Sequence, residues 1–173
     1  MIIEEEMAIR SKAVPMIQSA KNEPAIETLS VAATLKHHLN SLFSLCCRLE
    51  HIADSLPNNV DRQECLFVAR SIHPLVRRAH DFEEEVLFSV LRESAFDSDS
   101  LRETLDRLQC EHWEDESFAE EIQQELYRFV REPKAVNPES LGYMLRGFFE
   151  GMRRHLAFER EHVMPLLTKV GSR

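Results

Sequence analysis

The sequence predicts an all-α protein, an antiparallel up-down-up-down four-helix bundle, from its composition, the spacing of its apolar residues and its breaks. Leu, Glu, Arg and Ala dominate the 173 residues, and only four are glycine, a mix that favours long helices. Four segments show the helical spacing of apolar residues. Short breaks rich in Pro, Asn, Asp and Ser separate them, so consecutive helices should lie antiparallel.

The first helix is predicted over about residues 25–55, and the second from Asp61 to about residue 93. Asp61 is a good N-cap because its carboxylate can accept from free backbone amides. Pro74 removes a backbone hydrogen bond inside the second helix, so we expect a kink or a restart near His73. The apolar stripe of the first helix is Leu35, Leu42, Leu45 and Leu49.

The third and fourth helices carry clear start signals. Ser100 and Glu103 have the spacing of a capping box, which predicts that the third helix begins there. Asn137, followed by proline, predicts the start of the fourth helix. That helix should reach about Met164, where Pro165 weakens it.

The net charge and the lack of a long apolar run argue against several classes of protein. The formal charge of −9 is spread through mixed stretches, which argues against a nucleic-acid partner. No apolar run approaches a membrane span, and the start of the chain lacks the pattern of a signal peptide. We therefore expect a cytoplasmic protein with residues 1–24 as an extension, a short helix or an arm, and residues 25–170 as the bundle. Its oligomeric state stays open.

Polar residues interrupt each apolar stripe at positions that face inward. Each helix points one histidine at the bundle axis, and three helices add a glutamate four residues later, on the same face. The histidines are His38, His80, His112 and His155; the glutamates are Glu84, Glu116 and Glu159.

Burying four imidazoles and three carboxylates without partners would cost many kcal/mol, and most Arg and Lys lie off these stripes. A metal offsets that cost, and imidazole with carboxylate suits iron, manganese or zinc. A lone inward histidine is usually only a hydrogen-bonded core residue, but three His-x-x-x-Glu pairs on three stripes are harder to attribute to chance. His37, His51 and His73 are interpreted as structural. His162 is a candidate for supporting a metal ligand.

Two segments carry a family resemblance: His80-Asp-Phe-Glu-Glu-Glu-Val-Leu-Phe and His155-Leu-Ala-Phe-Glu-Arg-Glu-His-Val-Met-Pro. Together with Glu111-His112, they resemble the hemerythrin-like (HHE cation-binding) family over about residues 25–167. The resemblance implies a bundle that holds two iron ions with an oxo or hydroxo bridge, with manganese or zinc as alternatives.

The resemblance also implies roles for the candidate residues. Glu84 and Glu159 would bridge the metals, and the four histidines would be terminal ligands. Glu116 departs from the family's oxygen carriers, which place a second histidine there. A glutamate makes the site more anionic and should favour the ferric state, which puts reversible oxygen carriage in doubt. Whether Glu116 leaves a coordination position open stays undecided.

The first functional hypothesis is therefore a non-enzymatic module that binds or senses oxygen, iron or redox state, with a diatomic molecule or peroxide as its ligand. The second is a di-iron enzyme that consumes peroxide or nitric oxide, and the third is a bundle that metals only stabilise. No nucleophile or acid–base constellation stands out elsewhere.

Overall fold

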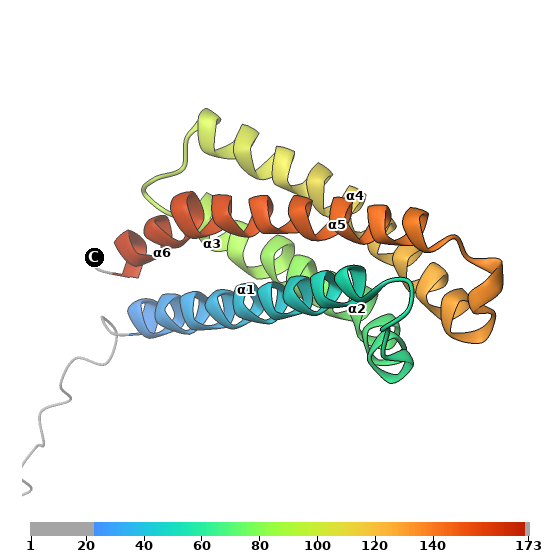
Figure 1. Ribbon diagram of the computed structural model, residues 1–173. Coiled ribbons are helices and arrows are strands. Elements are labelled where there is room, and N and C mark those ends of the chain that lie inside the picture. Colours follow the sequence, from blue (N-terminus) through green and yellow to red (C-terminus); the bar gives the residue numbers. More distant parts are fainter. Residues whose placement is uncertain (1–22, 172–173) are drawn as a thin grey trace, which may run out of the picture.

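The computed structural model describes residues 23–171, which form a bundle of long helices (Figure 1). Helix α1 covers Glu23–Ser55, α2 covers Arg62–Phe82, α4 covers Asp99–Arg131 and α5 covers Pro138–Phe158. Two short helices, α3 (Phe88–Arg92) and α6 (Met164–Gly171), continue α2 and α5 beyond π-helical turns at Glu83–Leu87 and Glu159–Val163. A 3₁₀ turn, Pro133–Ala135, lies between α4 and α5. The predicted all-α bundle is confirmed.

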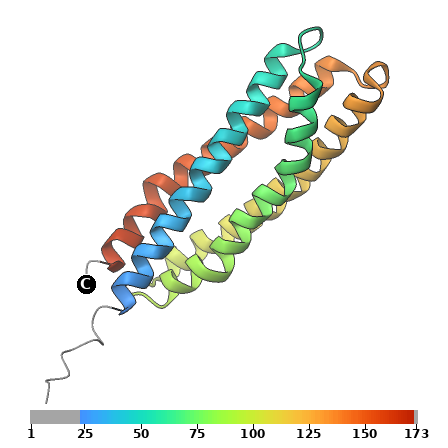
Figure 2. The ribbon, with the colours of Figure 1, turned by 90° about the horizontal axis from the view of Figure 1, so that it is seen from below.

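The helices pack in a ring in which each long helix has two main neighbours. Helix α1 packs against α2 and α5, and α4 packs against α2 and α5. Figure 2 shows α1 beside α5 and α2 beside α4 along most of their length. This ring turns one stripe of every helix toward a common core. Leu35, Ile72, Leu108 and Phe148 are core residues that are at most 1% exposed.

Two predicted N-caps are confirmed, and one is wrong. Asp61 accepts from the amides of Gln63 and Glu64, and Asn137 caps α5 in the same way. The N-cap of α4 is Ser98 rather than Ser100, because Ser98 is the extended residue whose hydroxyl accepts from the Leu101 amide, and the helix begins at Asp99. The start is therefore two residues earlier than the capping box predicted.

Neither internal proline ends its helix. Helix α2 runs through Pro74 without interruption, so the restart expected near His73 does not occur. The carbonyl freed by Pro74 belongs to the exposed Arg70, where water can satisfy it, while buried Ile72 and Val76 hold the helix on the core. Pro165 lies just after the π turn, inside the continuous helical path, and the carbonyls four and five residues before it belong to the exposed Glu161 and Arg160. The helical path therefore reaches Gly171, beyond the predicted end near Met164.

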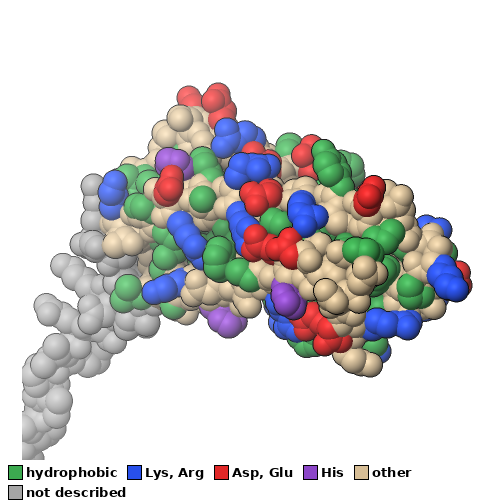
Figure 3. All heavy atoms as spheres, viewed as in Figure 1, with side chains coloured by type: hydrophobic (Ala, Val, Ile, Leu, Met, Phe, Trp, Pro, Cys, Tyr) green, Lys and Arg blue, Asp and Glu red, His purple; other side chains and the backbone are tan. Residues whose placement is uncertain are grey.

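The surface shows mixed charge. On the face in Figure 3, acidic and basic side chains lie among one another, with apolar side chains between them. Within residues 23–171, no helix is long and apolar enough to cross a membrane. The predicted extension at residues 1–24 lies almost entirely outside the described residues, because α1 begins at Glu23.

Candidate metal centre

Three histidines from three helices face one another in the core. His80 on α2 and His112 on α4 are each 1% exposed, and His155 on α5 is 7% exposed. The rings of His80 and His112 stack with centroids 4.0 Å apart and planes 5° apart, and the His155 ring lies 5.2 Å from that of His112. One ring nitrogen from each histidine lies within 4.8 Å of the other two, as ligands of a metal ion would.

Two buried glutamates complete the cluster. Glu83 and Glu159 are each 1% exposed, and their carboxylates group with His112 and His155 within the same 4.8 Å limit. Oε2 of Glu83 lies 3.1 Å from Nε2 of His112, and Oε1 of Glu159 lies 3.8 Å from Nε2 of His155. The two groups of possible ligands therefore share His112 and His155. We call the five residues His80, Glu83, His112, His155 and Glu159 the central cluster.

Both glutamates of the central cluster stand at the first position of a π-helical turn. The amide of Phe88 donates to the Glu83 carbonyl, and the amide of Met164 donates to the Glu159 carbonyl, five residues back in each case. A π turn holds one extra residue, so it rotates the side chains that follow relative to an uninterrupted α-helix. Glu83 and Glu159 are buried at the start of these turns, and Leu87 and Val163, four residues later, are buried at their ends.

The cluster lacks the hydrogen bonds that buried polar groups normally make. Among the described residues, the buried atoms without such a partner include both oxygens of Glu83 and of Glu159 and the Nε2 atoms of all three histidines. Each unsatisfied group of this kind costs about 1–3 kcal/mol. Three imidazole nitrogens and two carboxylates are donors that suit iron, manganese or zinc, so the residues present fit a metal ion.

Burial keeps two members of the cluster uncharged. Desolvation, together with the neighbouring His112 and His155, lowers the pKa of His80 to about 2. Desolvation, reinforced by the negative charge of Glu159, raises the pKa of Glu83 well above its ordinary value. A neutral imidazole is the form that binds a metal, whereas Glu83 must give up its proton to do so.

The pKa of His155 shifts in the opposite direction to that of His80. Burial lowers its pKa, but the carboxylates of Asp115 and Glu159 outweigh that effect and raise the pKa to about 10. Oδ2 of Asp115 lies 3.4 Å from Nδ1 of His155. The central cluster therefore holds one imidazolium beside two uncharged groups when no cation is bound.

Four of the seven residues predicted from the sequence come together here: His80, His112, His155 and Glu159. Glu84 and Glu116 do not join them. Each instead lies behind a histidine, with Glu84 Oε1 2.9 Å from Nδ1 of His112 and Glu116 Oε1 3.2 Å from Nδ1 of His80.

His38 stands outside the central cluster. It is half-buried on α1, and its ring packs edge-on against Phe82 with centroids 5.1 Å apart. Its Nδ1 is buried without a hydrogen-bond partner. Burial and the neighbouring His37 lower its pKa, while Glu159 opposes the shift, which places His38 within electrostatic reach of the cluster.

The sequence interpretation missed Glu83, although its position gave a signal. Glu83 follows Val76 by seven residues and precedes Leu87 by four, which is the spacing of the buried stripe itself. Reading Glu84 as inward relied on the four-residue step that also relates His155 to Glu159. That step assumes a regular α-helix up to Glu84, whereas the π turn begins one residue earlier.

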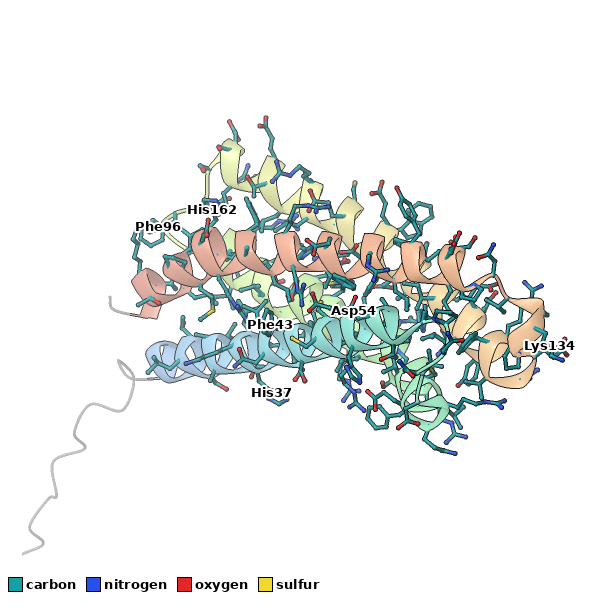
Figure 4. All side chains as sticks on the ribbon, viewed as in Figure 1. His37, Phe43, Asp54, Phe96, Lys134 and His162 are labelled. Carbon is teal, nitrogen blue, oxygen red and sulfur yellow. The ribbon has the colours of Figure 1, made fainter. Side chains whose placement is uncertain are left out.

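Two other histidines lie on the surface. Figure 4 shows His37 pointing away from the bundle, and the side chain is exposed. His162 is exposed too, against the ring of Phe158, and it borders a surface pocket together with Phe96 (Figure 4). Among the described residues, neither belongs to a group of possible metal ligands.

The fold and the central cluster together define a helical-bundle domain with a buried histidine–carboxylate site that could hold a metal. Residues 30–167 match the family described as Hemerythrin HHE cation binding domain. The chain belongs to this family, as the two sequence segments predicted. No curated protein and no solved structure matches the chain significantly.

Proposed function

We propose that this protein is a non-haem di-iron protein that binds or senses oxygen, iron or redox state at the central cluster. The observation that carries the proposal is the set of five buried side chains whose inward atoms lack hydrogen-bond partners. A cation would supply the missing partner for all of them at once. Membership of a cation-binding family supports the same conclusion.

The two groups of possible ligands share two histidines, and this favours a site for two metal ions over a site for one. His80, His112 and His155 form one group, and Glu83 and Glu159 form the other with the same His112 and His155. Carboxylates that bind through both oxygens can bridge two cations. Iron bound there would supply a change of oxidation state and an exchangeable position for a small ligand.

The side chains of the central cluster offer fewer ligand atoms than two metal ions have coordination positions. Three imidazoles and two carboxylates offer at most seven donor atoms, whereas two octahedral ions have twelve positions. Even with His38 as a further ligand, positions would remain for a small molecule. We therefore propose dioxygen, nitric oxide or peroxide as the exogenous ligand. The buried, largely apolar surroundings suit a small uncharged molecule better than a large substrate.

The test is metal content per chain, by mass spectrometry on protein produced with added iron, together with its visible spectrum. About two irons per chain in the wild type, lost in Glu159→Gln, would support the proposal; Glu161→Gln, at an exposed position two residues on, is the matched control. A folded wild type without metal would contradict it. Catalytic loss of added peroxide or nitric oxide, with iron retained, would assign an enzyme instead of a sensor.

A further inference from the structure

We infer that Glu84 and Glu116 are not metal ligands but positioning residues, each of which orients a histidine of the central cluster. Each carboxylate accepts a hydrogen bond from Nδ1 of one imidazole and so directs its Nε2 toward the metal site. The inference rests on the proposed function, because it concerns how that site is built.

The two contacts are reciprocal between neighbouring helices. Glu84, in the π turn after α2, lies 2.9 Å from Nδ1 of His112 on α4. Glu116, on α4, lies 3.2 Å from Nδ1 of His80 on α2. Each helix thus supplies the carboxylate that holds the other helix's imidazole. Gln109 fixes the Glu84 carboxylate further by donating to its second oxygen at 2.7 Å.

Hydrogen-bond chemistry sets the direction of each ring. A neutral imidazole has one N–H, and a carboxylate can only accept, so the proton must lie on Nδ1. The bare lone pair is then on Nε2, and in both His80 and His112 the Nε2 is the buried atom without a hydrogen-bond partner. A carboxylate behind a histidine ligand also makes the imidazole a stronger donor to a metal.

The exposure of consecutive acidic residues supports this division of roles. Glu83 is buried, Glu84 is 29% exposed in its side chain, and Glu85 is exposed. On α4, Glu116 is 28% exposed, and Glu114, two residues before it, is exposed. Glu85 and Glu114 are therefore matched controls on the same helices.

The first test follows the tautomers of the histidines in the metal-free protein, by long-range ¹H–¹⁵N NMR. The wild type should carry the proton on Nδ1 of both His80 and His112. Glu84→Ala should change the signals of His112 alone, and Glu116→Ala those of His80 alone. Glu84→Gln should keep the wild-type tautomer, because the amide oxygen still accepts. Glu85→Ala and Glu114→Ala should change neither.

The second test is iron binding by the same variants. Glu84→Ala and Glu116→Ala should keep the wild-type stoichiometry with affinity lowered about 10–100-fold, and Glu84→Gln should lose less. Glu83→Ala should lower the stoichiometry. A lowered stoichiometry in Glu84→Ala, or Nε2–H histidines in the wild type, would overturn the inference. A wild type that binds no iron would overturn the proposed function, and the NMR result would still decide the hydrogen bonds.

Discussion

Oε2 of Glu83 and Nε2 of His112 lie 3.1 Å apart, and each side chain is only 1% exposed. In water near neutral pH the carboxyl of a glutamate is ionised and an imidazole is partly protonated. Here desolvation raises the pKa of Glu83 and lowers that of His112, although the hydrogen bond to Glu84 opposes the second shift. An uncharged carboxylic acid therefore faces an uncharged imidazole. A cation bound between them would stabilise the ionised form of Glu83.

The first prediction is that Glu83→Gln stabilises the metal-free protein at pH 7. Folding forces Glu83 to hold a proton that the unfolded chain releases above a pKa of about 4.3, and glutamine removes that cost. We expect a gain of about 1–3 kcal/mol in the free energy of unfolding, measured with urea in the presence of a chelator. Glu85→Gln should stay within about 0.5 kcal/mol of the wild type, and a loss of stability in Glu83→Gln would contradict the prediction.

The second prediction concerns the pH dependence of that difference. Because the folded-state pKa of Glu83 is raised, the folded protein binds this proton more tightly than the unfolded chain does. The unfolding free energy of the wild type relative to Glu83→Gln should therefore fall as pH rises above about 4, by at most about 1.4 kcal/mol per pH unit. Below that pH the two should converge. Parallel stability curves from pH 4 to pH 7 would show that Glu83 ionises normally.

The third prediction is that iron stabilises the fold and releases protons as it binds. Metal that binds only the folded state adds about 2.7 kcal/mol at a free concentration one hundred times its dissociation constant. Since Glu83 and the imidazolium of His155 must each lose a proton to bind the metal, affinity should weaken as pH falls. Calorimetry in buffers of different ionisation enthalpy measures the protons released, and Glu159→Gln serves as the variant with a damaged site. Binding without proton release would contradict the assignment of Glu83 and His155 as ligands.

The sequence predicted the helices and most of the cluster because both depend on helical periodicity. His80, His112 and His155 interrupt apolar stripes, and in an α-helix a stripe position fixes which side chains face the core. The sequence interpretation chose Glu84 because its four-residue step from His80 equals the step from His155 to Glu159. The stripe spacing instead indicated Glu83, which follows Val76 by seven residues and is buried. The predicted start of α4 was wrong for a different reason: Ser98 is as good an N-cap residue as Ser100, and the backbone path selects Ser98.

The fourth prediction concerns an ion pair between α1 and α2 that involves no residue of the central cluster. Arg48 on α1 makes two hydrogen bonds to Glu64 on α2, at 2.5 and 2.8 Å, and its guanidinium also lies 3.8 Å from the centroid of the Phe67 ring. The hydrogen bond from Arg48 lowers the pKa of Glu64. The pair is partly exposed to solvent, so its contribution should stay within about 1 kcal/mol.

Glu64→Gln should therefore destabilise the protein by about 0.5–1 kcal/mol at pH 7, measured by urea unfolding. Because the folded-state pKa of Glu64 is lowered, this contribution is present above the unfolded-state pKa of about 4.3 and disappears as pH falls through the lower folded-state value. Variant and wild type should thus have equal stability once Glu64 is protonated in both states. Added salt should shrink the difference at pH 7, since exposed ion pairs are screened. A difference that persists unchanged in acid would mean that Glu64 acts through packing rather than through its charge.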